Sequence, residues 1–243
     1  MDFIIRIANT DIRIHSVYTS VYKVCKDYLV NEDIQPDFEI FSNDEMIYSE
    51  LEQMQKAGQP GSSLRGLESL LIHRLIAESL LDRDILLMHG AVIAAGDTSY
   101  MFSGRSGIGK TTHIQKWIEN VDGSYVVNGD KPLVMINQRG TYACGTPWCG
   151  KEGFGKNTIV PLRSIVFMER SPVNYIEEVS FKDIFITLLE QTYQPVDAVK
   201  MKKTLELLRM LKNKVSFYKF YFDNYKQDAF HTSFDALTNQ KHI

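Results

Sequence analysis

The sequence predicts an α/β protein with a small α+β unit over residues 1–60 and a larger domain over residues 61–243. First, short β-type runs and segments of helical periodicity follow one another along the chain. Second, a glycine-rich turn inside residues 99–119 joins an apolar run to a helix-like segment. Third, Gly-Gln-Pro-Gly-Ser-Ser at residues 58–63 has the composition of a linker, which sets the N-terminal unit apart.

The composition is that of a globular protein with a sizeable core, because 44% of the residues are hydrophobic and 23% are charged. The net charge is −3 without any block of like charge, so we expect no nucleic acid partner. We expect no membrane span and no signal peptide, since no apolar run has the required length. Three cysteines without a CxxC pattern (Cys25, Cys144 and Cys149) indicate reduced thiols and a cytoplasmic location.

The N-terminal unit is expected to contain a hairpin, a further strand and a helix. Phe3–Ile7 and Ile12–Ile14 are partly alternating runs separated by short polar residues, which is typical of a hairpin. Phe38–Phe41 is predicted to be a strand. Ser42–Glu45 has the capping-box pattern of a helix that would end near residue 56. Residues 17–30 leave helix and strand open.

The larger domain is predicted to begin with a long, largely buried helix over Leu64–Leu81, because its leucines recur at helical spacing. His73 lies in this helix and is interpreted as a structural or surface residue. A hairpin is expected around residues 137–140, and Val215–Phe222 indicates a buried strand. The other predicted strands cover residues 85–96 (as one or two strands), 100–102, 125–130 and 164–168, and the other helices cover 112–119, 181–191, 195–212 and 227–237.

The chain is organised around one motif, Gly104-Arg105-Ser106-Gly107-Ile108-Gly109-Lys110-Thr111, a full match to the phosphate-binding pattern G-x-x-x-x-G-K-[ST]. A loop that wraps a phosphate chain turns its backbone N–H groups inward, and glycine permits the dihedral angles that this requires. Lys110 is long enough to reach the β- and γ-phosphates, and the Thr111 hydroxyl suits Mg²⁺. Thr112 continues into a helix whose N-terminus adds positive partial charge. The alternative is a glycine-rich turn that leads into a helix.

Two side chains outside the motif are candidates for the same site. Asp130 follows an apolar strand 19 residues after Thr111, which allows one helix and a return into the sheet. It is the candidate acidic partner for Mg²⁺, and the alternative is a turn aspartate in Gly-Asp-Lys-Pro. His89 ends an apolar strand, where a core histidine with satisfied hydrogen bonds is the alternative.

The loop at residues 146–156 is too rich in special residues for a plain connection. Its glycines permit close approach of the backbone. Lys151 or Lys156 could neutralise phosphate charge, and Trp148 could stack on a ligand. The alternative is a surface hairpin with a packed tryptophan.

Three segments together resemble the catalytic core of HPr kinase/phosphorylase, which is similar to that of ATP-dependent phosphoenolpyruvate carboxykinase: Leu87–Val92, Phe102–Thr111 and Val127–Asp130. Residues 145–152, Gly-Thr-Pro-Trp-Cys-Gly-Lys-Glu, resemble a short branch of HPr-kinase-like proteins linked to peptide modification. The resemblance implies a P-loop core of mixed sheet flanked by helices, with ATP and Mg²⁺ as cofactors. It also implies phosphoryl transfer to a hydroxyl, His89 in the active site, and Asp130 as the metal-associated member of the family's paired aspartates.

The chain departs from the family at position 129. HPr kinases have two adjacent aspartates there, and this chain has Gly129-Asp130. Because the resemblance makes the first aspartate the acceptor of the hydroxyl proton, three possibilities stay open: Asp130 does both jobs, His89 is the base, or Asn128 orients the acceptor without deprotonating it. The departure counts against a reverse phosphorylase activity.

We therefore expect an ATP-dependent kinase that acts on a Ser or Thr hydroxyl of a peptide or protein. His89, Lys110 and Asp130 are the expected catalytic residues, Thr111 and Asp130 the Mg²⁺ ligands, and residues 104–112 with Lys151 the nucleotide-binding set. The alternatives are a nucleotide-binding module that guides a peptide to a partner enzyme without catalysis, and a kinase of a small-molecule hydroxyl. The sequence leaves a homo-oligomer open.

Overall fold

The computed structural model describes residues 1–31, 33–56, 58, 62–223 and 228–239, and divides the chain into two compact units, Met1–Arg83 and Asp84–Ile243. The division differs from the predicted one at residue 60, because helix α3 (Leu64–Leu80) packs against the N-terminal unit. Its partners there are helices α1 (Thr19–Val24) and α2 (Asp44–Lys56) and strand β3 (Phe38–Phe41). Within the predicted linker, residues 59–61 lie outside the described residues. No described helix is long and apolar enough to cross a membrane.

A three-stranded sheet forms one layer of the N-terminal unit. Strands β1 (Asp2–Ile7) and β2 (Thr10–His15) form the predicted antiparallel hairpin, and β3 (Phe38–Phe41) adds to β2 in parallel. The hairpin turns on Ala8 and Asn9, whose φ angles of 48° and 58° match the right-handed twist of paired strands. The ambiguous stretch after β2 forms helix α1 (Thr19–Val24) and the 3₁₀ helix η1 (Lys26–Tyr28).

Helices α2 (Asp44–Lys56) and α3 complete this unit, followed by the 3₁₀ helix η2 (Leu81–Arg83). The cap of α2 differs from the predicted one, since the Asn43 side chain accepts from the backbone N–H of Met46 at 2.9 Å. The Ser42 hydroxyl instead donates to the carboxylate of Glu68 at 2.6 Å. Glu68 lies on α3, is fully buried, and also accepts from the backbone N–H of Tyr18 at 3.0 Å. This carboxylate therefore ties α3 to the segments that follow β2 and β3.

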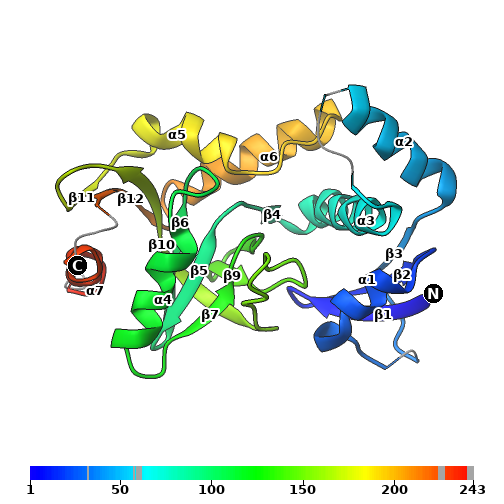
Figure 1. The fold of residues 1–243 in the computed structure, drawn as a ribbon, viewed down its shortest axis with the longest axis horizontal. Coiled ribbons are helices and arrows are strands. Elements are labelled where there is room, and N and C mark those ends of the chain that lie inside the picture. Colours follow the sequence, from blue (N-terminus) through cyan, green and yellow to red (C-terminus); the bar gives the residue numbers. More distant parts are fainter. Residues whose placement is uncertain (32, 57, 59–61, 224–227, 240–243) are drawn as a thin grey trace. The chain divides into compact units, whose positions relative to one another are not determined.

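The larger unit is a nine-stranded mixed sheet flanked by helices, as predicted (Figure 1). The strand order is β4-β8-β9-β10-β6-β5-β7, with β12 pairing with β10 and β11 pairing with β12. The strands are β4 (Ile85–Leu87), β5 (Ala91–Ala95), β6 (Thr98–Ser103), β7 (Tyr125–Asn128), β8 (Leu133–Asn137), β9 (Gly140–Cys144), β10 (Ile159–Arg170), β11 (Tyr175–Glu178) and β12 (Ser216–Phe222).

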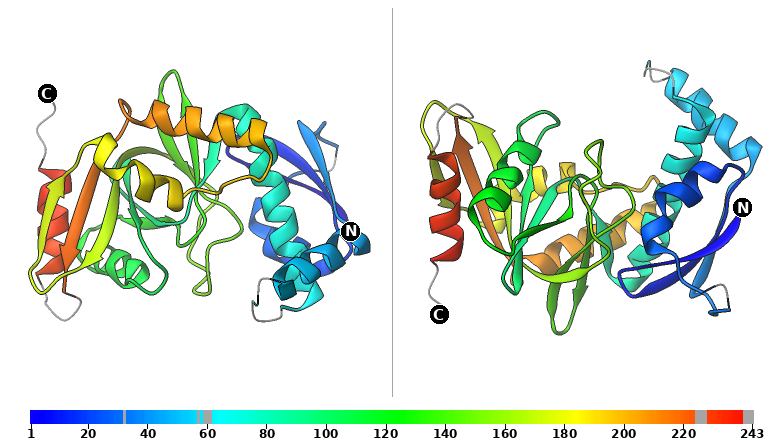
Figure 2. Two further views of the ribbon diagram at one scale, coloured as in Figure 1. Left: turned by 90° about the horizontal axis from the view of Figure 1, so that it is seen from above. Right: turned by 60° about the horizontal axis from the view of Figure 1, so that its bottom comes forward.

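Four helices accompany this sheet: α4 (Lys110–Asn120), α5 (Phe181–Glu190), α6 (Ala198–Leu211) and α7 (Ala229–Thr238). Figure 2 shows α7 beside α4, and α6 alongside α5. Ser180 and Asp197 cap α5 and α6 by accepting hydrogen bonds from backbone N–H groups of the first turns. The predicted start of the last helix at Gln227 lies outside the described residues.

Two features of the sheet were not predicted. Within the part of the chain that the structure describes, strand β11 is an edge strand that pairs with β12 alone. It exposes most of its side chains, so it lacks an apolar pattern. Strand β10 is 12 residues long, because its first residues pair with β9 and its later ones with β6 and β12. Pro161 and Arg163 interrupt the apolar pattern before its predicted start.

The core beneath α4 is aromatic. Trp117 of α4 is fully buried and packs on Tyr100 of β6, with ring centroids 5.1 Å apart, and on Phe234 of α7 at 5.3 Å. Burial of such large side chains is worth roughly 2–3 kcal/mol each, which fixes α4 against the sheet. Since α4 begins at Lys110, this packing also fixes the end of the glycine-rich loop.

Candidate active site

Strand pairing brings three separate segments to one edge of the sheet. Strand β5 pairs antiparallel with both β6 and β7, so the start of β5 lies beside the ends of the other two. Ala91 pairs with Phe102, and Val92 pairs with Asn128. The glycine-rich loop after β6, the His89-Gly90 pair before β5 and the Gly129-Asp130 pair after β7 therefore meet at this edge.

The glycine-rich loop has the conformation that its sequence predicts. Gly104 has φ +144°, and a Cβ there would lie 3.1 Å from the backbone oxygen of Met168 on the neighbouring strand β10. Gly109 has φ +116° and forms the N-cap of α4. A side chain at either position would be strained, so the loop needs glycine to turn tightly from β6 into α4. The N-terminus of α4 consequently opens onto the loop and favours an anion there.

Lys110 is buried beside this loop, with only 8% of its surface exposed. Its Nζ donates to the backbone oxygens of Gly104 and Arg105 at 2.9 and 3.3 Å. Burial lowers the pKa of Lys110, Asp130 opposes this effect, and Lys131 adds to it. The ammonium thus lies folded against the first half of the loop, where a bound phosphate would offer it stronger acceptors than two carbonyls.

The imidazole of His89 lies between two polar side chains. Its Nδ1 is 3.0 Å from Oε1 of Gln191, and its Nε2 is 3.5 Å from Oδ1 of Asp130. Burial lowers the pKa of His89, followed by the charges of Lys110 and Lys131, while Asp130 and Gln191 raise it. These effects together favour the neutral ring, and each of its nitrogens faces an oxygen atom of a neighbouring side chain.

Asn128 does not face the cavity. The sequence left open that it orients the acceptor hydroxyl in place of a general base. It is fully buried, and its Nδ2 donates to the backbone oxygen and the hydroxyl of Thr146 at 3.2 and 2.9 Å. Its Oδ1 accepts from the backbone N–H groups of Asp130 and Lys131 at 2.8 and 2.7 Å. The amide is therefore used in holding the chain, and it does not orient an acceptor hydroxyl.

The loop at 146–156 packs tightly against the end of β7. The backbone N–H of Gly129 donates to the oxygen of Phe154, and that of Lys156 donates to the oxygen of Val127. The Nζ of Lys156 lies 4.4 Å from the centre of the Tyr125 ring, away from the glycine-rich loop. Of the two lysines proposed for phosphate binding, only Lys151 lines the cavity at the site, and Trp148 does not line it.

These segments enclose a cavity of about 420 Å³. It is lined by His89, Ser106, Gly107, Gly109, Lys110, Thr111, Thr112, Gly129, Asp130, Gly150, Lys151 and Glu152. Two cations, two carboxylates, a neutral imidazole and a helix N-terminus in one cavity suit a metal-bound polyphosphate. Within the described residues no group of three or more His, Cys, Asp and Glu side chains is placed to hold a metal ion by itself. The hydroxyl of Thr111 and the carboxylate of Asp130 are the oxygen ligands that Mg²⁺ prefers.

A second cavity of about 450 Å³ adjoins the other side of the glycine-rich loop. Its walls are Gly104, Arg105 and Ile108, the end of β10 from Phe167 to Arg170, and residues 187, 190 and 191 at the end of α5. Gln191 lines this second cavity and contacts His89 of the first. Different residues of the glycine-rich loop therefore line the two cavities.

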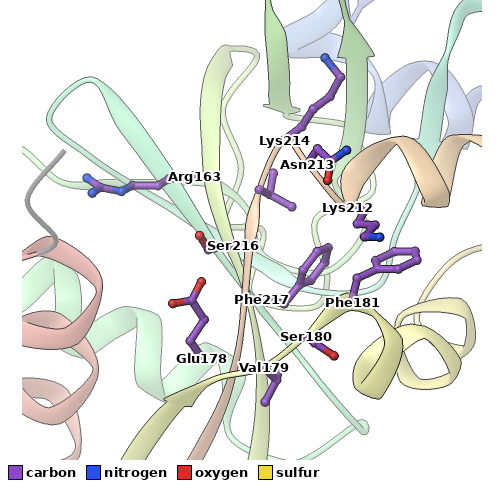
Figure 3. A pocket seen from close by; sticks show the side chains of 11 residues that line it. Arg163, Glu178, Val179, Ser180, Phe181, Lys212, Asn213, Lys214, Ser216 and Phe217 are labelled. Carbon is purple, nitrogen blue, oxygen red and sulfur yellow. The ribbon is translucent and has the colours of Figure 1, made fainter. Parts of the chain in front are cut away.

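A third cavity of about 550 Å³ lies among β11, β12 and the start of α5, and it does not include the glycine-rich loop (Figure 3). Figure 3 shows Arg163 and Lys214 extending in different directions from this cavity. The Nζ of Lys214 donates to the backbone oxygen of Asn137 at 2.9 Å, and Arg163 hydrogen-bonds the Tyr100 hydroxyl. Arg163 and Lys214 therefore already have protein partners and do not converge on one point of this cavity.

Comparison with known proteins identifies no family for this chain. No family model matches it, and no curated protein matches its sequence. Among solved structures, the Hpr(Ser) kinase/phosphatase from Coxiella burnetii is similar at 12% sequence identity and a TM-score of 0.31, over 52% of this chain and 91% of that one. This is a weak similarity at the level of the fold, and it defines neither the function nor the site of this chain.

Proposed function

We propose that this chain is an ATP-dependent kinase that transfers the γ-phosphoryl group to a Ser or Thr hydroxyl of a peptide or protein. One observation supports this best, namely the convergence of Lys110, Thr111, Asp130 and His89 around one cavity at a helix N-terminus. Phosphoryl transfer requires little covalent chemistry from the protein. Its rate depends on positioning and on neutralising the phosphate charge, which are the properties of this residue set.

The proposed roles follow from where each group lies. Backbone N–H groups of residues 106–112 bind the phosphates, and Lys110 leaves its two carbonyl partners for the β- and γ-phosphates. Thr111 and Asp130 would hold Mg²⁺, which when bound neutralises charge on the phosphates. Lys151 stabilises the outer oxygens from the loop side. His89, which is neutral, donates or accepts a hydrogen bond at the γ-phosphate end.

A nucleotide-binding module without catalysis is the second candidate, and position 129 favours it. A Cβ at Gly129 would lie 2.9 Å from the backbone oxygen of Cys149 and 3.2 Å from that of Phe154. The acid that the resemblance to HPr kinases assigns to the hydroxyl proton therefore has no room at this position. Formation of a phosphorylated product decides between the two candidates.

The test compares Lys110→Ala with Lys116→Ala, which removes the same charge from an exposed position on the same helix. MgATP binding is measured by titration calorimetry, and a mixture of Ser/Thr peptides is analysed for added phosphate by mass spectrometry. We expect Lys110→Ala to lower phosphorylation by at least about 100-fold and Lys116→Ala to leave it unchanged. Equal turnover by both variants contradicts the kinase proposal. MgATP binding by the wild type without any phosphorylated product supports the binding module.

A further inference from the structure

The loop at residues 146–156 fills the space beside Gly129, and it also carries a carboxylate that lines the same cavity. Glu152 lies at its tip and lines the cavity together with Asp130 and Thr111. Resting on the proposed kinase function, we propose that Glu152 is a catalytic residue that accepts the proton of the attacking hydroxyl. The inference assigns to this loop the role that the end of β7 does not fill.

Packing shows why the base does not come from β7. The space around Gly129 is filled by the backbone of residues 149–154, with two carbonyl oxygens within 3.2 Å of the position of a Cβ. The same loop is packed closely elsewhere, since a Cβ at Gly145 would lie 1.9 Å from the backbone oxygen of Lys156. A shift of the loop that admits a side chain at position 129 therefore disturbs several contacts together.

The position of the Glu152 carboxylate is defined through Gly150. A Cβ at Gly150 would lie 3.6 Å from Oε2 of Glu152 and 3.9 Å from Cγ of Asp130. Both carboxylates thus lie within 4 Å of one point beside the cavity. Gly150 has φ +88°, so the turn that directs Glu152 back towards Asp130 requires glycine.

Among the acidic and basic groups of the cavity, Lys151 and Glu152 are the two that have no hydrogen-bond or ion-pair partner within the described residues, and Glu152 is the acidic one. His89 contacts Gln191 and Asp130 through its two ring nitrogens, and Asp130 contacts His89 and is the proposed Mg²⁺ ligand. The side chain of Glu152 makes no hydrogen bond or ion pair with the residues that the structure describes. A general base needs a lone pair that is available to the substrate, and this carboxylate provides it.

In the proposed step, one bond forms and one bond breaks at the γ-phosphorus. The acceptor hydroxyl oxygen forms a bond to the γ-phosphorus while the bond from that phosphorus to the β,γ-bridging oxygen breaks. The electron pair of the broken bond leaves with ADP. The hydroxyl proton moves to the carboxylate of Glu152, which later releases it to solvent. No oxidant, reductant or further reactant is needed.

The test measures ADP formation from MgATP, with water or a Ser/Thr peptide mixture as acceptor, in Glu152→Gln, Glu152→Ala and the control Glu119→Gln. Glu119 is an exposed acid on α4 outside the cavity. We expect both Glu152 variants to bind MgATP with wild-type affinity and to form ADP at least about 100-fold more slowly, with the control unchanged. We expect added formate, a small carboxylate, to restore ADP formation in Glu152→Ala and not in Lys110→Ala.

The outcomes separate this inference from the proposed function. A wild-type protein that does not bind MgATP contradicts the proposed function itself. Wild-type rates in Glu152→Gln, or a loss in Glu152→Ala that formate does not restore, overturn the role of Glu152 and leave the kinase proposal standing. A wild type that binds MgATP and forms no ADP overturns the role of Glu152 and supports the binding module. Thermal unfolding of each variant shows whether it is folded.

Discussion

Gly129→Asp tests the steric reasoning directly, because it restores the pair of adjacent aspartates found in the HPr kinases that this sequence resembles. If glycine stands at position 129 without a structural reason, the added acid would raise turnover. If the glycine is required by the packing of residues 149–154, the added side chain has no space. The two interpretations predict opposite signs for the change in both stability and activity.

The expected magnitude follows from the contacts that a Cβ would make. Distances of 2.9 and 3.2 Å to the backbone oxygens of Cys149 and Phe154 are shorter than ordinary carbon–oxygen contacts. Overpacking of this kind costs roughly 1–3 kcal/mol. The carboxylate adds a further cost, since it would face two carbonyl oxygens. For a chain of this size each kcal/mol lowers Tm by about 2–4 °C, so we expect a decrease of about 2–12 °C.

The assay is scanning calorimetry combined with ADP formation from MgATP. Gly153→Ala is the matched control, because Gly153 lies on the same loop with φ +68° and no atom within 4 Å of its Cβ position. The control carries only the cost of a left-handed backbone, about 1–2 kcal/mol. We expect Gly129→Asp to lower turnover as well as Tm. A Gly129→Asp variant that is as stable as the wild type and faster would refute the reasoning.

Two further predictions concern stability. Burial lowers the pKa of His113 from 6.5 to about 3. Between these two pH values the unfolded chain therefore binds more protons than the folded chain. The free energy of unfolding falls as the pH drops through this window, by up to about 1.4 kcal/mol per pH unit. In His113→Gln this contribution disappears, and urea unfolding at pH 7 and pH 5 checks it; an unchanged loss of stability at pH 5 would count against the assignment. Glu68→Ala leaves the backbone N–H groups of Val17 and Tyr18 without their acceptor, and we expect a cost of about 1–3 kcal/mol in the N-terminal unit, measured by hydrogen exchange. Unchanged protection of that unit would contradict it.

Local sequence patterns were sufficient for most elements of the fold. The hairpin at β1–β2, the strand β3 and helix α5 with its Ser180 cap were predicted almost to their ends, because alternation, turn residues and caps act over a few residues. Strand β11 was missed, since an exposed edge strand needs no apolar alternation. The predicted boundary at residue 60 differs from the division after Arg83, because a linker composition does not show which unit the next helix packs against.

The candidate site brings together residues that the sequence analysis named, and their roles stay predictions. The order of the motifs placed Lys110, Asp130 and His89, and strand pairing then brings them to one edge of the sheet. The sequence did not show which side chains face the cavity, because this depends on long-range packing. Lys156 turns to Tyr125, and Asn128 turns inward. Glu152 was not singled out, although an acid between two glycines in a lysine-bearing loop is the signal that could have identified it.

The amide of Asn128 links positions 129 and 152 of the chain. One end of this side chain holds the backbone of Asp130 and the other holds Thr146, at the start of the loop that carries Glu152. The position of the metal-binding candidate and that of the proposed base are therefore set by the same buried side chain. A carboxylate at position 128 could not replace it, because it has no N–H to donate to Thr146. The loop thus excludes an acid from position 129 through the same attachment that brings the acid at position 152 to the cavity.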